Sequence, residues 1–149
     1  MEIKLRAMLF ALPIISLMAL ALPPSTADPA SALPSGLTPH NPIYIHGNNN
    51  FTSANGVVGG SGAENDPYII ENWDISARDA HGIHVENTTA YFIIRNCYVH
   101  DGRNNIKYGI CFDNVLDGTI ENIMSVNNYG SIVFRHSSNN VIKNCFTSD

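Results

Sequence analysis

One short phrase occurs four times in this 149-residue chain and restricts the fold more than any other feature. In each copy an isoleucine is followed by a charged residue and an asparagine, and successive copies are 24, 26 and 22 residues apart. A period of this length is typical of solenoids, in which one repeat cannot bury its apolar residues alone. The copies are Ile70-Glu71-Asn72, Ile94-Arg95-Asn96, Ile120-Glu121-Asn122 and Ile142-Lys143-Asn144.

A second phrase lies between these copies. It reads "GIHVEN" from Gly82, "GICFDN" from Gly109 and "SIVFRH" from Ser131, and the apolar residues two positions apart fall in register. Strands rich in Ile, Val and Phe, punctuated by Gly and Asn, are predicted here rather than helices. We therefore predict an all-β fold over residues 43–149, a right-handed parallel β-helix of about four coils.

Stacked coils place equivalent residues about 4.8 Å apart, so the repeat predicts columns of side chains. The charged column alternates in sign, which favours attraction between neighbouring coils. The asparagine column suits a bend, because Asn tolerates the left-handed conformation and its amide can hydrogen-bond to the amides above and below. We expect both columns to be structural ladders: Glu71, Arg95, Glu121 and Lys143 for charge, and Asn72, Asn96, Asn122 and Asn144 for the bend.

The N-terminal region predicts export. Lys4 and Arg6 precede an apolar run, and small residues lead up to Ala27, as in a secretory signal peptide over residues 1–27. Residues 28–42, rich in Pro, Ser and Ala, then form a linker. We expect a secreted or cell-surface protein with no membrane span in the mature chain. The net charge of -5 and the absence of a basic cluster argue against a nucleic-acid partner.

The phrases "NGVVGGSGAENDPYIIENWDI", "GIHVENTTAYFIIRNC", "GICFDNV" and "SSNNVIKNC" resemble secreted right-handed parallel β-helix proteins of archaea and bacteria. These include the NosD-like periplasmic proteins and the β-helix domains of carbohydrate-binding and sugar-hydrolysing proteins. The resemblance implies an exported module with a structural or recognition role at the cell surface, and a polysaccharide or surface glycan as partner. It leaves open a polysaccharide lyase or glycoside hydrolase, and a copper- or zinc-binding periplasmic accessory protein. No cofactor is expected, and we favour a protein that is not an enzyme.

The candidate chemistry lies on the outward face of the Gly-Ile strands. His84 and Cys111 share one predicted column, and Glu86 and Asp113 share the next. The imidazole and thiol could bind zinc or copper, and the two carboxylates could serve as acid and base on a sugar. The alternative is an ordinary solvated face in which Arg135 neutralises Asp113. Five aromatic residues could stack on sugars: Trp73, Tyr91, Tyr98, Tyr108 and Tyr129.

The cysteines and the C-terminal coil complete the predictions. Cys97 and Cys145 fall in one column two coils apart, about 9.6 Å, which is beyond disulfide reach. We predict no disulfide, with Cys111 pointing outward and the other two acting as small buried residues. The final phrase "NCFTSD" provides no cap for the stack. We therefore expect either a longer stack or end-to-end pairing of this open coil with another chain.

Overall fold

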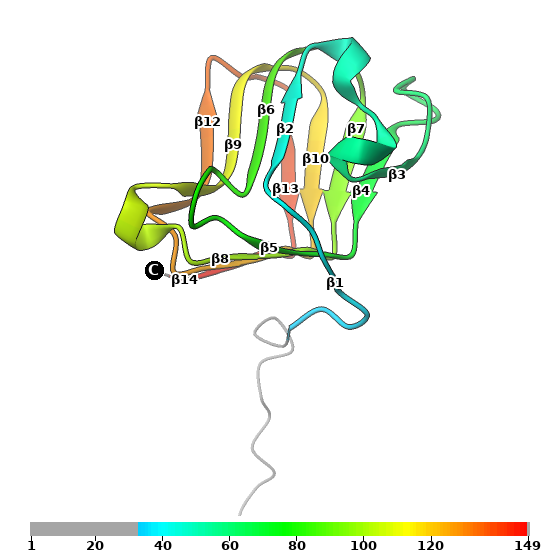
Figure 1. The fold of residues 1–149 in the computed structure, drawn as a ribbon. Helices are drawn as coiled ribbons and strands as arrows, with labels where there is room; N and C mark the ends of the chain where they lie inside the picture. The colour runs from blue at the N-terminus through cyan, green and yellow to red at the C-terminus, as the bar shows by residue number, and fades with distance from the viewer. Residues whose placement is uncertain (1–32, 149) are drawn as a thin grey trace, which may run out of the picture.

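The structure is a computed structural model that describes residues 33–148, so the predicted signal peptide lies outside the described residues. The chain winds through three sheets that form a β-solenoid, which confirms the predicted fold class (Figure 1). The solenoid has about three turns, whereas the sequence predicted about four coils. One turn consists of β4 (Tyr68–Glu71), β5 (Trp73–Ser76) and β6 (Ile83–Thr88). The later strands are β7 (Phe92–Arg95), β8 (Tyr98–His100), β9 (Tyr108–Val115), β10 (Gly118–Glu121), β11 (Met124–Val126), β12 (Gly130–Arg135), β13 (Val141–Lys143) and β14 (Phe146–Ser148).

Three further strands precede the regular turns: β1 (Thr38–Pro39), β2 (Ile43–His46) and β3 (Val57–Gly59). The strand orders are β1-β5-β8-β11-β14, β13-β10-β7-β4-β3 and β12-β9-β6-β2. All pairings between these strands are parallel except that of β3 with β4. Because β1 pairs with β5, part of the segment predicted to be a linker belongs to the solenoid.

The strand register places the four isoleucines of the repeat in one column, and the charged residues that follow them in the next. Ile70, Ile94 and Ile120 are fully buried. The charged column forms two separate ion pairs. Arg95 Nε lies 2.5 Å from Glu71 Oε2, and Lys143 Nζ lies 2.7 Å from Glu121 Oε2.

Each turn bends at residues in the left-handed conformation. The asparagines of the predicted ladder, residues 72, 96, 122 and 144, have φ values between 52° and 64°. Among the described residues no hydrogen bond joins their side-chain amides to one another. A single amide–amide hydrogen bond occurs instead at the bend after the Gly-Ile strands, where Asn114 Nδ2 donates to Asn87 Oδ1 at 2.9 Å. The sequence thus predicted the left-handed bend correctly but placed the amide bond at the wrong corner.

The segment between β2 and β4 caps the N-terminal end of the stack. It contains the short 3-10 helices η2 (Asn48–Asn50) and η3 (Ser53–Asn55), which Figure 1 shows across the end of the turns. Phe51 is buried and stacks on Tyr68 with ring centroids 4.6 Å apart. Trp73 Nε1 donates to the Gly56 carbonyl at 2.8 Å. Aromatic packing therefore seals the first turn.

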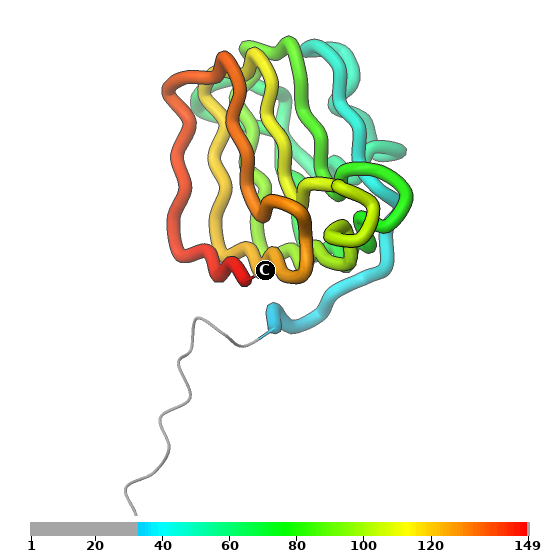
Figure 2. The backbone as a smooth tube through the Cα atoms, turned by 90° about the vertical axis from the view of Figure 1, so that its left-hand side faces the viewer, coloured from blue at the N-terminus to red at the C-terminus, as the bar shows by residue number. Residues whose placement is uncertain are grey.

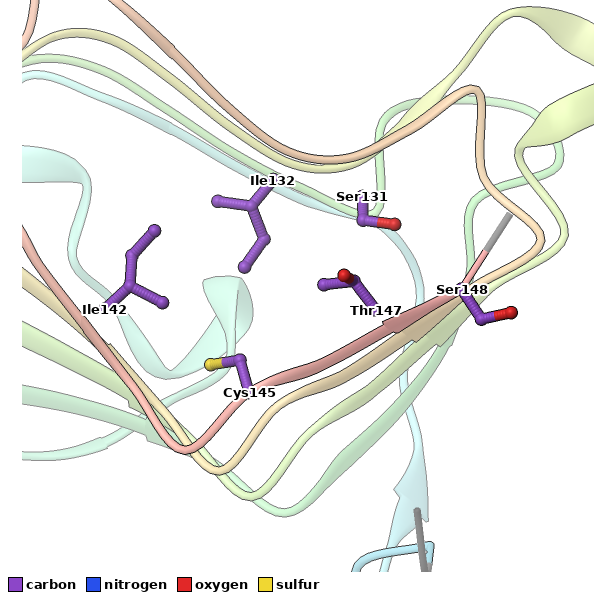
Figure 3. Close-up of a pocket in the computed structure, with 6 residues that line it drawn as sticks. All are labelled: Ser131, Ile132, Ile142, Cys145, Thr147 and Ser148. Atoms are coloured by element: carbon purple, nitrogen blue, oxygen red, sulfur yellow. The ribbon is translucent and has the colours of Figure 1, made fainter. Parts of the chain in front are cut away.

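The other end of the described stack is open. In Figure 2 the last turn, in red, lies at the edge of the stack, and β12, β13 and β14 each have a neighbour on one side only. Ile142, which is a core position in the earlier turns, is 48% exposed there. The resulting cavity of about 440 Å³ is lined by Ser131, Ile132, Ile142, Cys145, Thr147 and Ser148 (Figure 3). It is the uncovered end of the core.

All three cysteines are free. Cys97 is fully buried in the core, and burial raises the pKa of its thiol to about 12. Cys145 is only half-buried because it lies in the last turn. Over residues 33–148 no helix is long and apolar enough to cross a membrane.

Candidate functional site

The outer face of the sheet β12-β9-β6-β2 brings together histidine, tyrosine, cysteine and carboxylate side chains. The register pairs Tyr44 with His84 and His84 with Cys111, and in the next column it pairs His46 with Glu86 and Glu86 with Asp113. The columns continue to Val133 and Arg135 on β12. The sheet therefore places the four residues singled out from the sequence on neighbouring strands and adds two from β2. Figure 1 shows β12, β9, β6 and β2 side by side.

Glu86 organises one half of this face. Its Oε1 accepts a hydrogen bond from the Tyr44 hydroxyl and a second, at 2.7 Å, from His46 Nδ1. His84 Nε2 lies 3.6 Å from the other carboxylate oxygen. The Tyr44 ring is 51% exposed and lies 5.2 Å from the His84 ring. One carboxylate thus holds an exposed aromatic ring in a fixed orientation between two imidazoles.

These contacts decide the charge of Glu86. The hydrogen bonds from Tyr44 and His46 lower the pKa of the Glu86 carboxyl, and the hydrogen bond to Glu86 raises the pKa of Tyr44. Glu86 is therefore an anion that accepts hydrogen bonds, and Tyr44 is a protonated donor. A general acid for glycoside hydrolysis needs the opposite shift, a raised carboxyl pKa.

A second group of rings lies at the start of the same strands. The His81 ring stacks on Tyr108 with centroids 4.9 Å apart, and Tyr129, 56% exposed, lies 6.0 Å from Tyr108. Arg135 lies over the Tyr108 ring at 5.2 Å and also donates to its hydroxyl at 3.1 Å. Arginine and imidazole thus hold this aromatic surface in place.

Two expectations for this face need correction. Cys111 points away from the core, as predicted, but it is fully buried beneath its neighbours, and burial raises the pKa of its thiol. Arg135 binds Tyr108, whereas Asp113 lies 3.3 Å from His136 Nδ1, so the Arg135–Asp113 pair of the solvated-face alternative does not form. Long side chains on neighbouring strands reach diagonal partners as easily as direct ones.

The weak metal and catalytic candidates do not converge on one point. In the part of the chain that the structure describes, no group of three or more His, Cys, Asp or Glu side chains could hold a metal ion. A buried thiol with a raised pKa at Cys111 is a poor ligand, because metals bind the thiolate. Neither Glu86 nor Asp113 has the environment of an acid poised to protonate a leaving group: Glu86 is held as an anion, and Asp113 contacts His136.

The aromatic residues named from the sequence divide by position. Tyr108 and Tyr129 belong to this outer face. Trp73 is half-buried, bonded to Gly56 and packed against His40, which makes it part of the N-terminal cap. Tyr98 stacks on His100 in another sheet. Tyr91 lies just before β7, and its backbone N–H donates to the Gly62 carbonyl. Two of the five predicted aromatic residues are thus in the candidate site.

Sequence reasoning missed Tyr44 and His46, the two residues contributed by β2. The signal was the stretch "IYIHGN", in which Ile43 and Ile45 match Ile83 and Val85 of the Gly-Ile phrase. The step between them is 40 residues, outside the range of 22 to 26, because the cap intervenes. The break in the period concealed an additional strand of the sheet.

Comparison with known proteins supports the fold. A protein-family model described as "Right handed beta helix region" matches residues 40–149. No curated protein and no solved structure matches the chain. The match covers the whole described solenoid except its first few residues.

Proposed function

Because the chain belongs to the right-handed β-helix family, we propose that it is an exported module that binds glycans at the cell surface. The binding surface is the outer face of the sheet β12-β9-β6-β2. Export rests on the composition of residues 1–27, a charged start followed by an apolar run and small residues.

The binding proposal rests on one observation. The Tyr44 ring is exposed, and its hydrogen bond to Glu86 fixes its orientation. Sugar rings have apolar C–H faces that pack on aromatic rings, and their hydroxyls need donors and acceptors around that ring. His46 and His84 lie beside Tyr44, and Tyr108 and Tyr129 extend the aromatic surface along the sheet. A ring that is already oriented loses little conformational entropy on binding.

The test is retardation of the purified protein in gels that contain soluble polysaccharides. Tyr44→Ala removes the aromatic platform, so we expect affinity for the retarding polysaccharide to fall at least tenfold. Tyr91→Ala is the matched control, because Tyr91 is half-exposed and bonds through its backbone to Gly62, away from this face. A parent protein that no polysaccharide retards, or full retardation of Tyr44→Ala, would contradict the proposal.

The same samples address the enzymatic alternative. A lyase or hydrolase releases new chain ends from the polysaccharide during incubation, whereas a binding module does not. Chain-end release that disappears in Glu86→Gln would favour the hydrolase and replace the binding proposal. We expect no release, because the hydrogen bonds of Glu86 hold it as an anion.

A further inference from the structure

A small cavity adjoins Tyr44 and has an unusual mixture of lining groups. Its volume is about 210 Å³, and its lining includes Pro42, Tyr44, Asp79, Ala80, His81 and Lys107. A water molecule occupies about 30 Å³ in the liquid, so the cavity has room for a substituent of several heavy atoms. The cavity opens beside the exposed aromatic ring, which places it within reach of a sugar that packs on that ring.

Hydrogen bonding fixes the state of His81 in this lining. The backbone N–H of Tyr108 donates to His81 Nδ1 at 2.9 Å, so Nδ1 carries no proton and Nε2–H is a donor. Burial, followed by the nearby charges of His84, Lys107 and Arg135, lowers the pKa of His81, which keeps this ring neutral. His81 therefore presents a neutral N–H group.

Ile43 and His84 also line the cavity, and the other lining residues supply three further chemical features. Lys107 adds a cationic donor, and Asp79 adds a carboxylate that accepts hydrogen bonds. Pro42 and Ala80 add apolar surface. A fitting group therefore has an acceptor, a donor and a small apolar end within one short substituent.

We propose that this cavity receives the acetamido group of an N-acetylated amino sugar whose ring packs on Tyr44. The carbonyl oxygen accepts from His81 and Lys107, the amide N–H donates to Asp79, and the methyl group contacts Pro42 and Ala80. A sugar carboxylate fits less well, because it has no donor for Asp79 and repels its charge. A bare hydroxyl leaves the apolar surface unfilled. This inference rests on the proposed glycan-binding function and names its ligand class.

Two trisaccharides with the same β-1,4 backbone provide the test. Triacetylchitotriose carries three acetamido groups, and cellotriose carries hydroxyls in their place. In calorimetric titrations of the protein we expect triacetylchitotriose to bind at least tenfold more tightly. Asp79→Ala and Lys107→Met should each reduce that preference several-fold, whereas Glu64→Ala, an exposed acidic residue away from the cavity, should leave it unchanged.

The outcomes separate this inference from the proposed function. Equal affinity for the two trisaccharides, or a preference that survives Asp79→Ala and Lys107→Met, overturns the acetamido assignment. If neither trisaccharide binds while another glycan binds in a Tyr44-dependent way, the assignment fails and the glycan-binding function stands. If Tyr44→Ala changes no glycan interaction, both fail. Asp79 is exposed, so its replacement leaves the core intact, and circular dichroism confirms folding of each variant.

Discussion

At the scale of single residues, asparagine sets the shape of each turn. Asn is less hindered than most residues in the left-handed conformation, and it takes that conformation at all three bends, for example at Asn72, Asn87 and Asn127. The sequence repeat revealed only the bend that contains Asn72. At that bend every copy has an isoleucine and a charged residue before the asparagine. The second bend ends in Asn87, Asn114 and His136, and this change of residue type concealed it.

The acid response of the fold should depend on Glu86. Its folded-state pKa is lowered by hydrogen bonds, so its stabilisation is complete above its unfolded pKa, about 4.3, and is lost as the pH falls through the folded value. In the Glu86→Gln variant the side chain at position 86 cannot ionise, so this contribution to the pH dependence is lost. We expect this variant to have a lower free energy of unfolding at neutral pH and a shallower loss of stability below about pH 5.

Urea denaturation of the parent and Glu86→Gln across that pH range measures the effect. Glu64→Gln serves as the control, because Glu64 is exposed and lies in the loop before β4. Parallel stability curves for the parent and Glu86→Gln below neutral pH would show that the contacts of Glu86 do not stabilise the folded state.

At the scale of strands, the sequence repeat correctly predicted which residues of successive turns pair with one another. Columns built on Ile70, Ile94, Ile120 and Ile142 could be derived because each position must be compatible with its own copies above and below. The structure of residues 47–67 cannot be predicted in this way, because these residues form the cap and have no counterpart in the repeat. Nor does the repeat predict diagonal contacts, such as that of Arg135 with Tyr108, which depend on side-chain length.

The charged column gives a prediction at this scale. Arg95 lies between Glu71 and Glu121, so Arg95→Glu places three carboxylates in succession on neighbouring strands. These side chains are partly exposed, and we expect a loss of about 1 kcal/mol in the free energy of unfolding, smaller at high salt. Urea denaturation at low and high ionic strength measures it. Arg95→Gln, which removes the pair without adding repulsion, should show a smaller loss; equal losses for the two variants would argue against repulsion along the column.

At the scale of the whole molecule, the two ends of the described stack differ. Phe51 and Trp73 help to seal the first turn, whereas Ile142 and the edges of β12, β13 and β14 are uncovered at the last. Unpaired strand edges with exposed apolar side chains promote pairing between chains. The first turn also has edge strands, β1, β2 and β3, but there Phe51 and Trp73 cover the core. We therefore expect association through the exposed core at the other end, which joins two copies.

Sedimentation velocity over a range of concentrations tests this association. We expect the parent to form dimers as its concentration rises and Ile142→Lys to remain monomeric. Val58→Lys is the matched control, since Val58 on β3 is 52% exposed, similar to the 48% of Ile142, but belongs to the cap. A parent that is monomeric at every concentration, or dimers that persist in Ile142→Lys, would rule out pairing through this end.

Because the cap closes only the first turn, further turns could be inserted among the later ones without disturbing the capped end. Strand β2 pairs with β6, and Thr88 at the end of β6 donates a hydrogen bond to Asn48 of the cap, so both strands are held at the capped end of the stack. Duplicating a unit such as residues 110–131 within the later rungs should therefore lengthen the protein while leaving Tyr44 and Glu86 in place. Each such variant would present the same outer face of β2 and β6 on a solenoid of a different length.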